Sequence, residues 1–133
     1  MSLRAITLNE RLIWIVDSEH WPRSALRAEL IERGYEAIGH IRLDEALSRL
    51  HSAPSQAKPH AIVVDLCGQE VSRGALQELA GSTIPTIILG GQAELNDPLI
   101  KEHTWTAMLK RPIMLGEIAD LIERIVPLRR DMH

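Results

Sequence analysis

The sequence has one cysteine, no phenylalanine and one tyrosine among its 133 residues. A single thiol, Cys67, cannot form an internal disulfide, so a disulfide-stabilised fold is excluded. No apolar run approaches the roughly 18 residues that span a membrane. The N-terminal residues also lack the charged segment and apolar core of a signal sequence. These absences predict a cytoplasmic protein that does not cross a membrane.

An excess of positive charge is also missing. The chain has 15 lysines and arginines against 18 acidic residues, which gives a net charge of -3. The only short basic cluster is Arg129-Arg130, and Asp131 partly offsets it. Without a basic patch there is no field to attract a polyanion, so no direct nucleic-acid binding is expected.

What remains is the composition of one ordinary globular domain. Hydrophobic residues make up 45% of the chain and charged residues 25%. A chain of this length buries one core and is too short for two ordinary domains. We expect a lead-in at residues 1–11, a domain at 12–126, and a C-terminal tail or linker stub at 127–133.

Apolar runs of strand length alternate with helical patterns along the chain. The expected strands are 12–16, 35–38, 61–64, 84–89 and 106–109. The expected helices are 22–33, 44–51, 74–79, a segment near 97–102, and 115–126, with a surface loop at 52–59. Strands that are apolar throughout and alternate with helices indicate a parallel sheet covered on both faces. The predicted fold is therefore α/β, a flavodoxin-like doubly wound five-stranded parallel sheet.

Two aspartates, Asp17 and Asp65, each directly follow an apolar run. In a doubly wound sheet the ligand site lies beyond the carboxyl ends of the strands, so both carboxylates should emerge at one edge. Two oxygen ligands there suit Mg²⁺, and an acid held beside the metal could attack phosphorus and form an acyl phosphate. Each aspartate alone could instead form a turn by binding the backbone two residues on.

Six segments together resemble the receiver domains of response regulators, over residues 12–125. The segments are Ile15-Val16-Asp17-Ser18-Glu19, Arg33-Gly34-Tyr35-Glu36, Asp44-Glu45-Ala46-Leu47, Pro59-His60-Ala61-Ile62-Val63-Val64-Asp65-Leu66, Ile84-Pro85-Thr86-Ile87-Ile88-Leu89 and Lys110-Arg111-Pro112. The resemblance implies that Asp65 accepts a phosphoryl group from a histidine kinase or phosphotransfer protein. It also implies that Asp17 and Asp65 bind Mg²⁺ together with the backbone carbonyl of Cys67.

The first departure from the family pattern is Ser18, which stands where the resemblance implies a second metal-binding acid. A neutral hydroxyl is a weaker ligand than a carboxylate. Glu19 is the nearest replacement acid for the metal, although it could instead cap the following helix at its positive end.

Further departures affect the phosphate-binding residues. Gly90 replaces the family's Ser or Thr, while the N–H groups of Gly90 and Gly91 could either bind an anion or belong to an ordinary turn. Arg111 replaces the lysine before Pro112, and without a phosphoryl group it could pair with Asp65 and Asp17. The resemblance favours a cis bond between Arg111 and Pro112.

Met108 stands at the aromatic switch position of the family, so the usual coupling of a hydroxyl to a moving ring cannot operate. A flexible thioether there predicts core filling. The competing site types find no support, because the six histidines lack zinc-site spacing and no glycine-rich loop follows the first strand. The pattern of a haloacid-dehalogenase phosphatase is also incomplete.

Two functions remain open from the sequence. The first is a two-component receiver that accepts a phosphoryl group at Asp65 and relays it by a surface change. The second is a pseudo-receiver that binds proteins without phosphorylation. Neither is an enzyme beyond self-phosphorylation from a phosphohistidine or a small phosphodonor. Downstream effectors are further expected partners, and a homodimer through residues 97–102, 106–109 and 115–126, with Trp105 at its border, would fit the resemblance.

Overall fold

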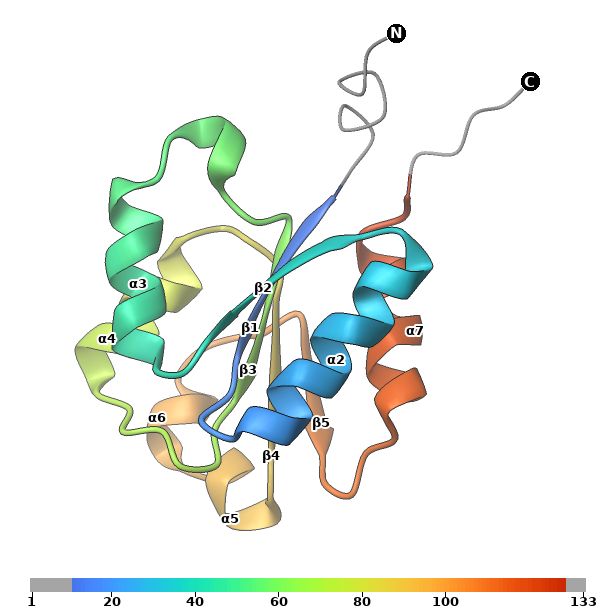
Figure 1. Cartoon of the computed structure of the whole chain (residues 1–133). Helices are drawn as coiled ribbons and strands as arrows, with labels where there is room; N and C mark the ends of the chain where they lie inside the picture. The colour runs from blue at the N-terminus through green and yellow to red at the C-terminus, as the bar shows by residue number, and fades with distance from the viewer. Residues whose placement is uncertain (1–10, 129–133) are drawn as a thin grey trace, which may run out of the picture.

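The computed structural model describes residues 11–128, so most of the expected lead-in and tail lie outside the described residues. Its five strands form one parallel sheet in the order β2-β1-β3-β4-β5 (Figure 1). The strands are β1 (Leu12–Val16), β2 (Glu36–His40), β3 (Ala61–Asp65), β4 (Thr86–Gly90) and β5 (Ala107–Lys110). This confirms the flavodoxin-like doubly wound fold.

Helices cover both faces of the sheet (Figure 1). One face packs against α2 (His20–Arg33) and α7 (Leu115–Ile125). The other packs against α3 (Leu43–Ser52), α4 (Arg73–Gly81), α5 (Gln92–Leu95) and α6 (Pro98–Lys101). None of the helices within residues 11–128 has the length and apolar composition needed to cross a membrane.

The apolar runs form buried strands because successive side chains point to opposite faces. In β1, Ile13 and Ile15 pack towards α2 and α7, whereas Trp14 and Val16 pack towards α3 and α4. Every residue of β3 and β4 is buried in the same two-sided way. Such strands show unbroken apolar runs rather than alternation, as the sequence predicted.

Most expected boundaries lie within two residues of the observed ones. Gly34 ends α2 in a left-handed conformation, with φ of 111°, and so stops the helix as predicted. Strand β2 begins one residue later than expected and ends at His40. Tyr35, just before the strand, is buried and donates a 2.6 Å hydrogen bond from its hydroxyl to the Val126 carbonyl. The expected loop at 52–59 contains a short 3-10 helix, Ser55–Ala57.

The connection between β4 and β5 differs from the sequence-based expectation. The expected helix near 97–102 is the single-turn α6, and α5 precedes it as a second turn that the sequence did not indicate. Asp97 caps α6 by accepting a 2.9 Å bond from the Leu99 N–H, and Pro98 at its first position cannot continue the preceding helix. Two separate turns replace one longer helix.

This thin cover leaves part of β5 open to solvent. Met108 is 45% exposed, so the prediction that it fills the core is wrong. Trp105 is half-buried against the same side of the sheet and donates a 2.9 Å bond from Nε1 to the Ile100 carbonyl. Met108 is exposed because α5 and α6 are short and cover little of β5. The residue type at position 108 does not indicate how much of it other elements cover.

Ion pairs connect helices α2 and α7. The guanidinium of Arg33 binds Asp120 and Glu123 of α7 at 2.7 and 3.2 Å, and Glu29 of its own helix at 2.8 Å. Its bond to Asp120, then those to Glu29 and Glu123, raise the pKa of Arg33 above its ordinary value. The carboxylates of Asp120 and Glu123 therefore already have a partner.

His40 is a buried histidine at the end of β2. It is 5% exposed, its ring centroid lies 4.5 Å from that of Trp14, and its Nε2 has no hydrogen-bond partner among the described residues. Burial lowers the pKa of His40, and the charge of Arg49 lowers it further, while Glu45 opposes the shift. The folded protein thus favours neutral imidazole.

We predict that acid weakens the fold through His40. Above its ordinary pKa of 6.5 the imidazole is neutral in both states. Below it the unfolded chain takes up a proton that the folded chain resists, so the free energy of unfolding falls. Urea unfolding of wild type and His40→Gln between pH 7.5 and 5 measures this loss. The wild type should lose more stability than the variant, and parallel curves would rule out His40 as the cause.

Candidate functional site

The two predicted acids lie side by side at the carboxyl edge of the sheet. Asp17 directly follows β1 and Asp65 ends β3, and the register pairs the preceding residues Val16 and Val64. Their exposed fractions are only 6% and 2%. Each carboxylate also accepts a backbone N–H two residues on, Asp17 from Glu19 at 2.9 Å and Asp65 from Cys67 at 3.0 Å. Each aspartate therefore stabilises the turn after its strand and also places a carboxylate at the edge of the sheet.

Arg111 provides the positive charge of the site. Its backbone N–H donates to the Gly90 carbonyl at 2.9 Å, which places the residue just beyond β5. Its Nη2 forms an ion pair with Oδ2 of Asp65, while its own side chain is 41% exposed. The cis bond to Pro112 expected from the resemblance is present. Of the two expected partners, Asp65 is the one in direct contact with Arg111.

Asp17 lies close to that pair and forms no salt bridge with any residue between 11 and 128. Burial raises the pKa of Asp17, and the charge of Glu19 adds to this effect. The hydrogen bond from the Glu19 N–H and the charges of Arg111 and Arg23 oppose the shift without cancelling it. Burial therefore disfavours the charged form of Asp17 more than its hydrogen bond and the nearby cations favour it.

Ser18 occupies the position of the missing second acid. Its hydroxyl donates a 3.0 Å hydrogen bond to the Cys67 carbonyl, the group expected to complete a metal shell. Gly68, with φ of 77°, lies so close that an added Cβ would collide with Ser18 Oγ. Serine and glycine thus fix the loop after β3 directly against the loop after β1.

The side chain of Glu19 does not cap α2. The residue stands at the N-cap position, but its side chain makes no capping hydrogen bond and is exposed. Within residues 11–128 no group of three or more histidine, cysteine, aspartate or glutamate side chains is placed to hold a metal ion. Glu19 as a replacement for the acid missing at Ser18 therefore stays a prediction.

The Gly90–Gly91 turn is closed by a carboxylate of the chain itself. The Gly91 N–H donates a 2.7 Å bond to Oε1 of Glu94. An added Cβ at the buried Gly90 would lie 3.1 Å from the same oxygen. The sequence analysis did not single out Glu94, although its position three residues after Gly91 is the spacing of a capping box.

Gln69 is a second residue that sequence reasoning missed. Its Oε1 accepts the Leu43 N–H at 2.9 Å and its Nε2 donates to the Ile41 carbonyl at 2.8 Å. These bonds tie the loop after Asp65 to the loop after β2. No local pattern signals them, because the partners lie more than 25 residues apart in the chain.

Comparison with known proteins supports the fold. No family model and no curated protein sequence matches the chain. Among solved structures, a response regulator receiver protein from Pseudomonas putida is similar with a TM-score of 0.72 and 21% identity, over 86% of this chain and 97% of that one. A receiver domain from Clostridium thermocellum gives 0.71 and 18%, over 87% and 94%. The chemotaxis response regulator CheY4 of Vibrio cholerae gives 0.70 and 18%, over 88% and 99%.

These likenesses show that the chain has the receiver fold from one end of the domain to the other. At such identities they describe the backbone and not the chemistry of the site. What the site can do is therefore judged from its own contacts.

We predict that removing the cation destabilises the fold. Arg111→Ala leaves the buried carboxylate of Asp65 without its partner, which should cost about 2–4 kcal/mol, towards the lower end because Arg111 is partly exposed. The control Lys110→Ala removes a neighbouring exposed cation and should change stability by less than about 0.5 kcal/mol. Urea unfolding measures both.

Adding Asp65→Asn to Arg111→Ala should recover part of the loss, because the unpaired charge disappears. Additive effects in this double-mutant cycle would show that the two side chains do not interact energetically.

A third substitution at the site should stabilise the protein. Because the folded-state pKa of Asp17 is raised above 3.8, its ionisation opposes folding at neutral pH. Asp17→Asn keeps an oxygen for the Glu19 N–H and removes the buried charge, so its melting temperature at pH 7 should exceed that of the wild type. The advantage should shrink as the pH falls and Asp17 takes up a proton. A less stable variant at pH 7 would contradict this account.

Proposed function

We propose that the chain is a signalling module of the receiver fold that binds protein partners without phosphorylation at Asp65. One observation carries the proposal: three of the polar groups that would hold a cation or phosphoryl group are already bonded within the chain. Arg111 binds Asp65, and Ser18 binds the Cys67 carbonyl. Glu94 binds the Gly91 N–H. A pseudo-receiver, the second function left open by the sequence, accounts for all three contacts.

Mg²⁺ does not fit this set of groups. Of the three groups that it would require, the Cys67 carbonyl accepts a hydrogen bond from Ser18 and the Asp65 carboxylate is paired with Arg111, which leaves only Asp17. A divalent cation would also meet the guanidinium, a like charge, beside Asp65. The proposed function therefore includes no metal-dependent step and no enzymatic activity.

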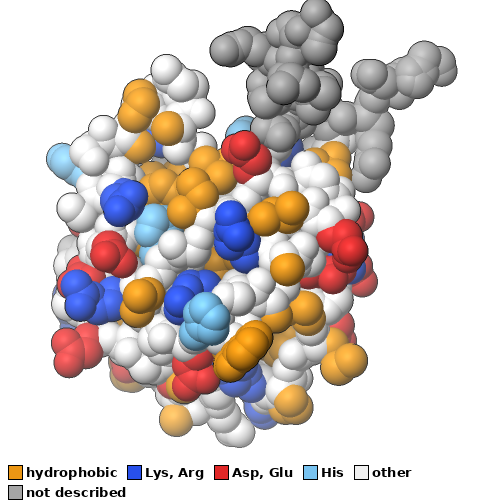
Figure 2. Space-filling model, in the orientation of Figure 1, with side chains coloured by type: hydrophobic (Ala, Val, Ile, Leu, Met, Phe, Trp, Pro, Cys, Tyr) orange, Lys and Arg blue, Asp and Glu red, His pale blue; other side chains and the backbone are white. Residues whose placement is uncertain are grey.

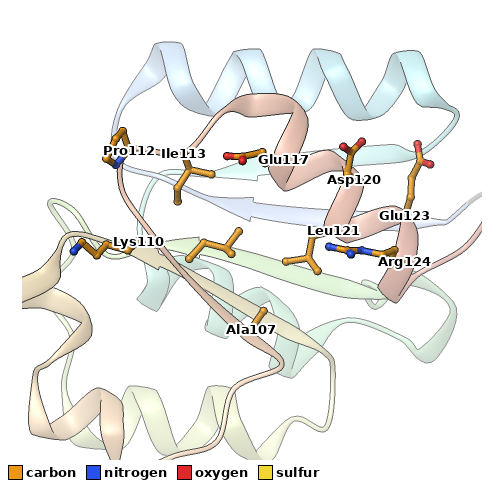
Figure 3. A pocket seen from close by; sticks show the side chains of 10 residues that line it. Ala107, Lys110, Pro112, Ile113, Glu117, Asp120, Leu121, Glu123 and Arg124 are labelled. Atoms are coloured by element: carbon orange, nitrogen blue, oxygen red, sulfur yellow. The ribbon is translucent and has the colours of Figure 1, made fainter.

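The proposed partner surface comprises α6, β5 and α7, which form the face predicted from the sequence, together with the neighbouring α5. Met108 and Met114 are 45% and 71% exposed there. A groove of about 860 Å³ runs between β5 and α7 (Figure 3). Leu121 and Arg124 point from α7 towards β5, whereas Asp120 and Glu123 point to the other side. The groove is lined by five apolar and five charged side chains, a mixed surface that suits a protein segment.

The partners that we propose for this face are a histidine kinase or phosphotransfer protein, a downstream effector or a second copy, all in the cytoplasm. Phosphorylation remains the competing function, since Asp17 and Asp65 are adjacent and a cation is retained. Binding of a phosphoryl mimic separates the two.

We predict that Mg²⁺ with beryllofluoride, a mimic of an aspartyl phosphate, leaves the melting temperature unchanged. A ligand of the folded state must raise stability in proportion to RT ln(1 + [L]/Kd). Calorimetry at millimolar Mg²⁺, with and without beryllofluoride, makes the measurement. A shift that needs both ligands and disappears in Asp65→Asn would establish the phosphoacceptor function instead.

A matched variant shows that the assay can detect binding. Ser18→Asp supplies the missing acid and removes the hydrogen bond from Ser18 to the Cys67 carbonyl. Arg111→Lys replaces the planar guanidinium with a smaller ammonium group. The double variant should gain stabilisation by Mg²⁺, whereas Glu19→Asp, which keeps the acid at its exposed position, should not.

A further inference from the structure

Strand β5 is an edge of the sheet, and its outer side is open. It pairs with β4 alone, so no strand within residues 11–128 lies on its other side. The Thr106 N–H binds the Thr86 carbonyl at 3.0 Å. Because the N–H and C=O groups of successive residues alternate in direction along a strand, those of Ala107 and Leu109 point away from β4. The edge of β5 therefore offers backbone groups to a further strand.

The opposite edge of the sheet, β2, is protected in a way that β5 is not. Arg27 Nε donates a 2.8 Å bond to the Ala37 carbonyl of β2. Acidic, basic and hydrophobic side chains are interspersed over that side of the molecule, which Figure 2 shows from the front. Among the described residues, no side chain forms a hydrogen bond with the backbone of residues 107–110. Of the two edges, β5 is thus the one with free backbone groups.

The charged side chains around β5 divide into engaged acids and free cations. Arg124 forms no ion pair with any described residue, and Lys110 reaches only the Gln92 side chain, at 3.5 Å. Every carboxylate of residues 92–125, in contrast, has a partner within the chain, which is a backbone N–H for Glu94, Asp97 and Glu117 and an arginine for Glu102, Asp120 and Glu123. This face can therefore pair with carboxylates from outside the chain.

The two free cations flank an apolar surface. Lys110 and Arg124 lie at opposite ends of the groove between β5 and α7, with Ala107 and Leu121 between them in the view of Figure 3. On the other side of the strand, Met108 is 45% exposed. Because alternate side chains of a strand point to opposite faces, a strand beside β5 would place its side chains over both the groove and Met108.

We propose that β5 accepts an extended segment of a partner protein in which apolar residues are flanked by aspartate or glutamate. The segment adds to the sheet through the N–H and C=O groups of Ala107 and Leu109. Its central side chains cover the groove and Met108, and its flanking carboxylates pair with Lys110 and Arg124. A second copy would bring the same cations, so charge favours a different protein. This partner is a more specific form of the one proposed above for the same face and rests on that function.

The probe is a synthetic peptide of about eight residues, the length of an ordinary strand, with valine and isoleucine at its centre and acidic residues at both ends. It is titrated into the ¹⁵N-labelled full chain. The amide signals of residues 107–110 and of α7 should shift, and added salt should weaken binding. The N–H groups of Ala107 and Leu109 should exchange with solvent more slowly, because they gain hydrogen-bond partners.

Comparison peptides test the charge and the conformation of the segment. A peptide with lysine in place of every acid should not bind. Two further peptides keep the acids and carry N-methyl groups at alternate central residues, one at the odd and one at the even positions. Only one edge of an added strand faces β5, so one of this pair should bind about tenfold more weakly and the other should keep its affinity.

Variants of the chain locate the contact. Arg124→Gln combined with Lys110→Gln removes both cations and should weaken binding of the acidic peptide about tenfold. The matched control Arg49→Gln removes an exposed arginine of α3 and should leave the affinity unchanged. Met108→Thr should weaken binding without a change in charge. Unfolding midpoints confirm that each variant is folded.

Several results would overturn the proposal. They are equal binding of the lysine peptide, equal affinities of the two N-methylated peptides, shifts centred on β2, or no shift at millimolar acidic peptide. Self-association through residues 107–110, detected by sedimentation, would assign the edge to a second copy instead. These outcomes are distinct from failure of the proposed function. Stabilisation by Mg²⁺ and beryllofluoride would establish phosphorylation at Asp65 whether or not β5 binds the peptide.

Discussion

The ion pair between Asp65 and Arg111 is the interaction on which the carboxyl edge of this sheet depends. Parallel strands bring Asp17 and Asp65 to one edge, where both carboxylates are almost fully buried. Buried charge is costly unless it is paired, and the raised pKa of Asp17 shows that the cost is only partly met. The guanidinium of Arg111 is part of the chain, so it cannot dissociate from the protein as a metal ion can. In the proposed pseudo-receiver the charge state of the edge is thereby set by the chain itself and not by the concentration of a ligand.

The fold was predictable because its signals are local. A strand buried on both faces needs an unbroken apolar run, and Gly34 marks the end of α2 by a backbone conformation that few other residues adopt. The placement of Asp17 and Asp65 followed from strand ends alone. Local signals failed between β4 and β5, where Pro98 starts one helical turn and thereby ends another. The exposure of Met108 depends on how much helix covers it, which is a tertiary property.

The contacts inside the site were less predictable than its members. Sequence reasoning named Asp65, Arg111 and Gly91, but not the bond of Gly91 to Glu94, whose capping-box spacing was present in the chain. The two bonds of Gln69 join loops far apart in sequence, and no periodicity encodes them. Residue types at strand ends thus indicate where chemistry could occur. The pairing of those residues decides whether an external ligand finds a free group.

The departures from the receiver pattern are consistent with one another. Serine in place of an acid does more than remove a ligand, since its hydroxyl occupies the Cys67 carbonyl. Glycine at position 90 removes a hydroxyl and also leaves the space that Glu94 fills, because a Cβ there would press against its carboxylate. If the replacements at Ser18, Gly90 and Arg111 were unrelated losses, they would leave unsatisfied polar groups at a buried edge, at a cost of about 1–3 kcal/mol each. Ser18 and Arg111 instead supply internal partners, and Gly90 leaves room for Glu94 to accept the Gly91 N–H, as expected for the proposed pseudo-receiver.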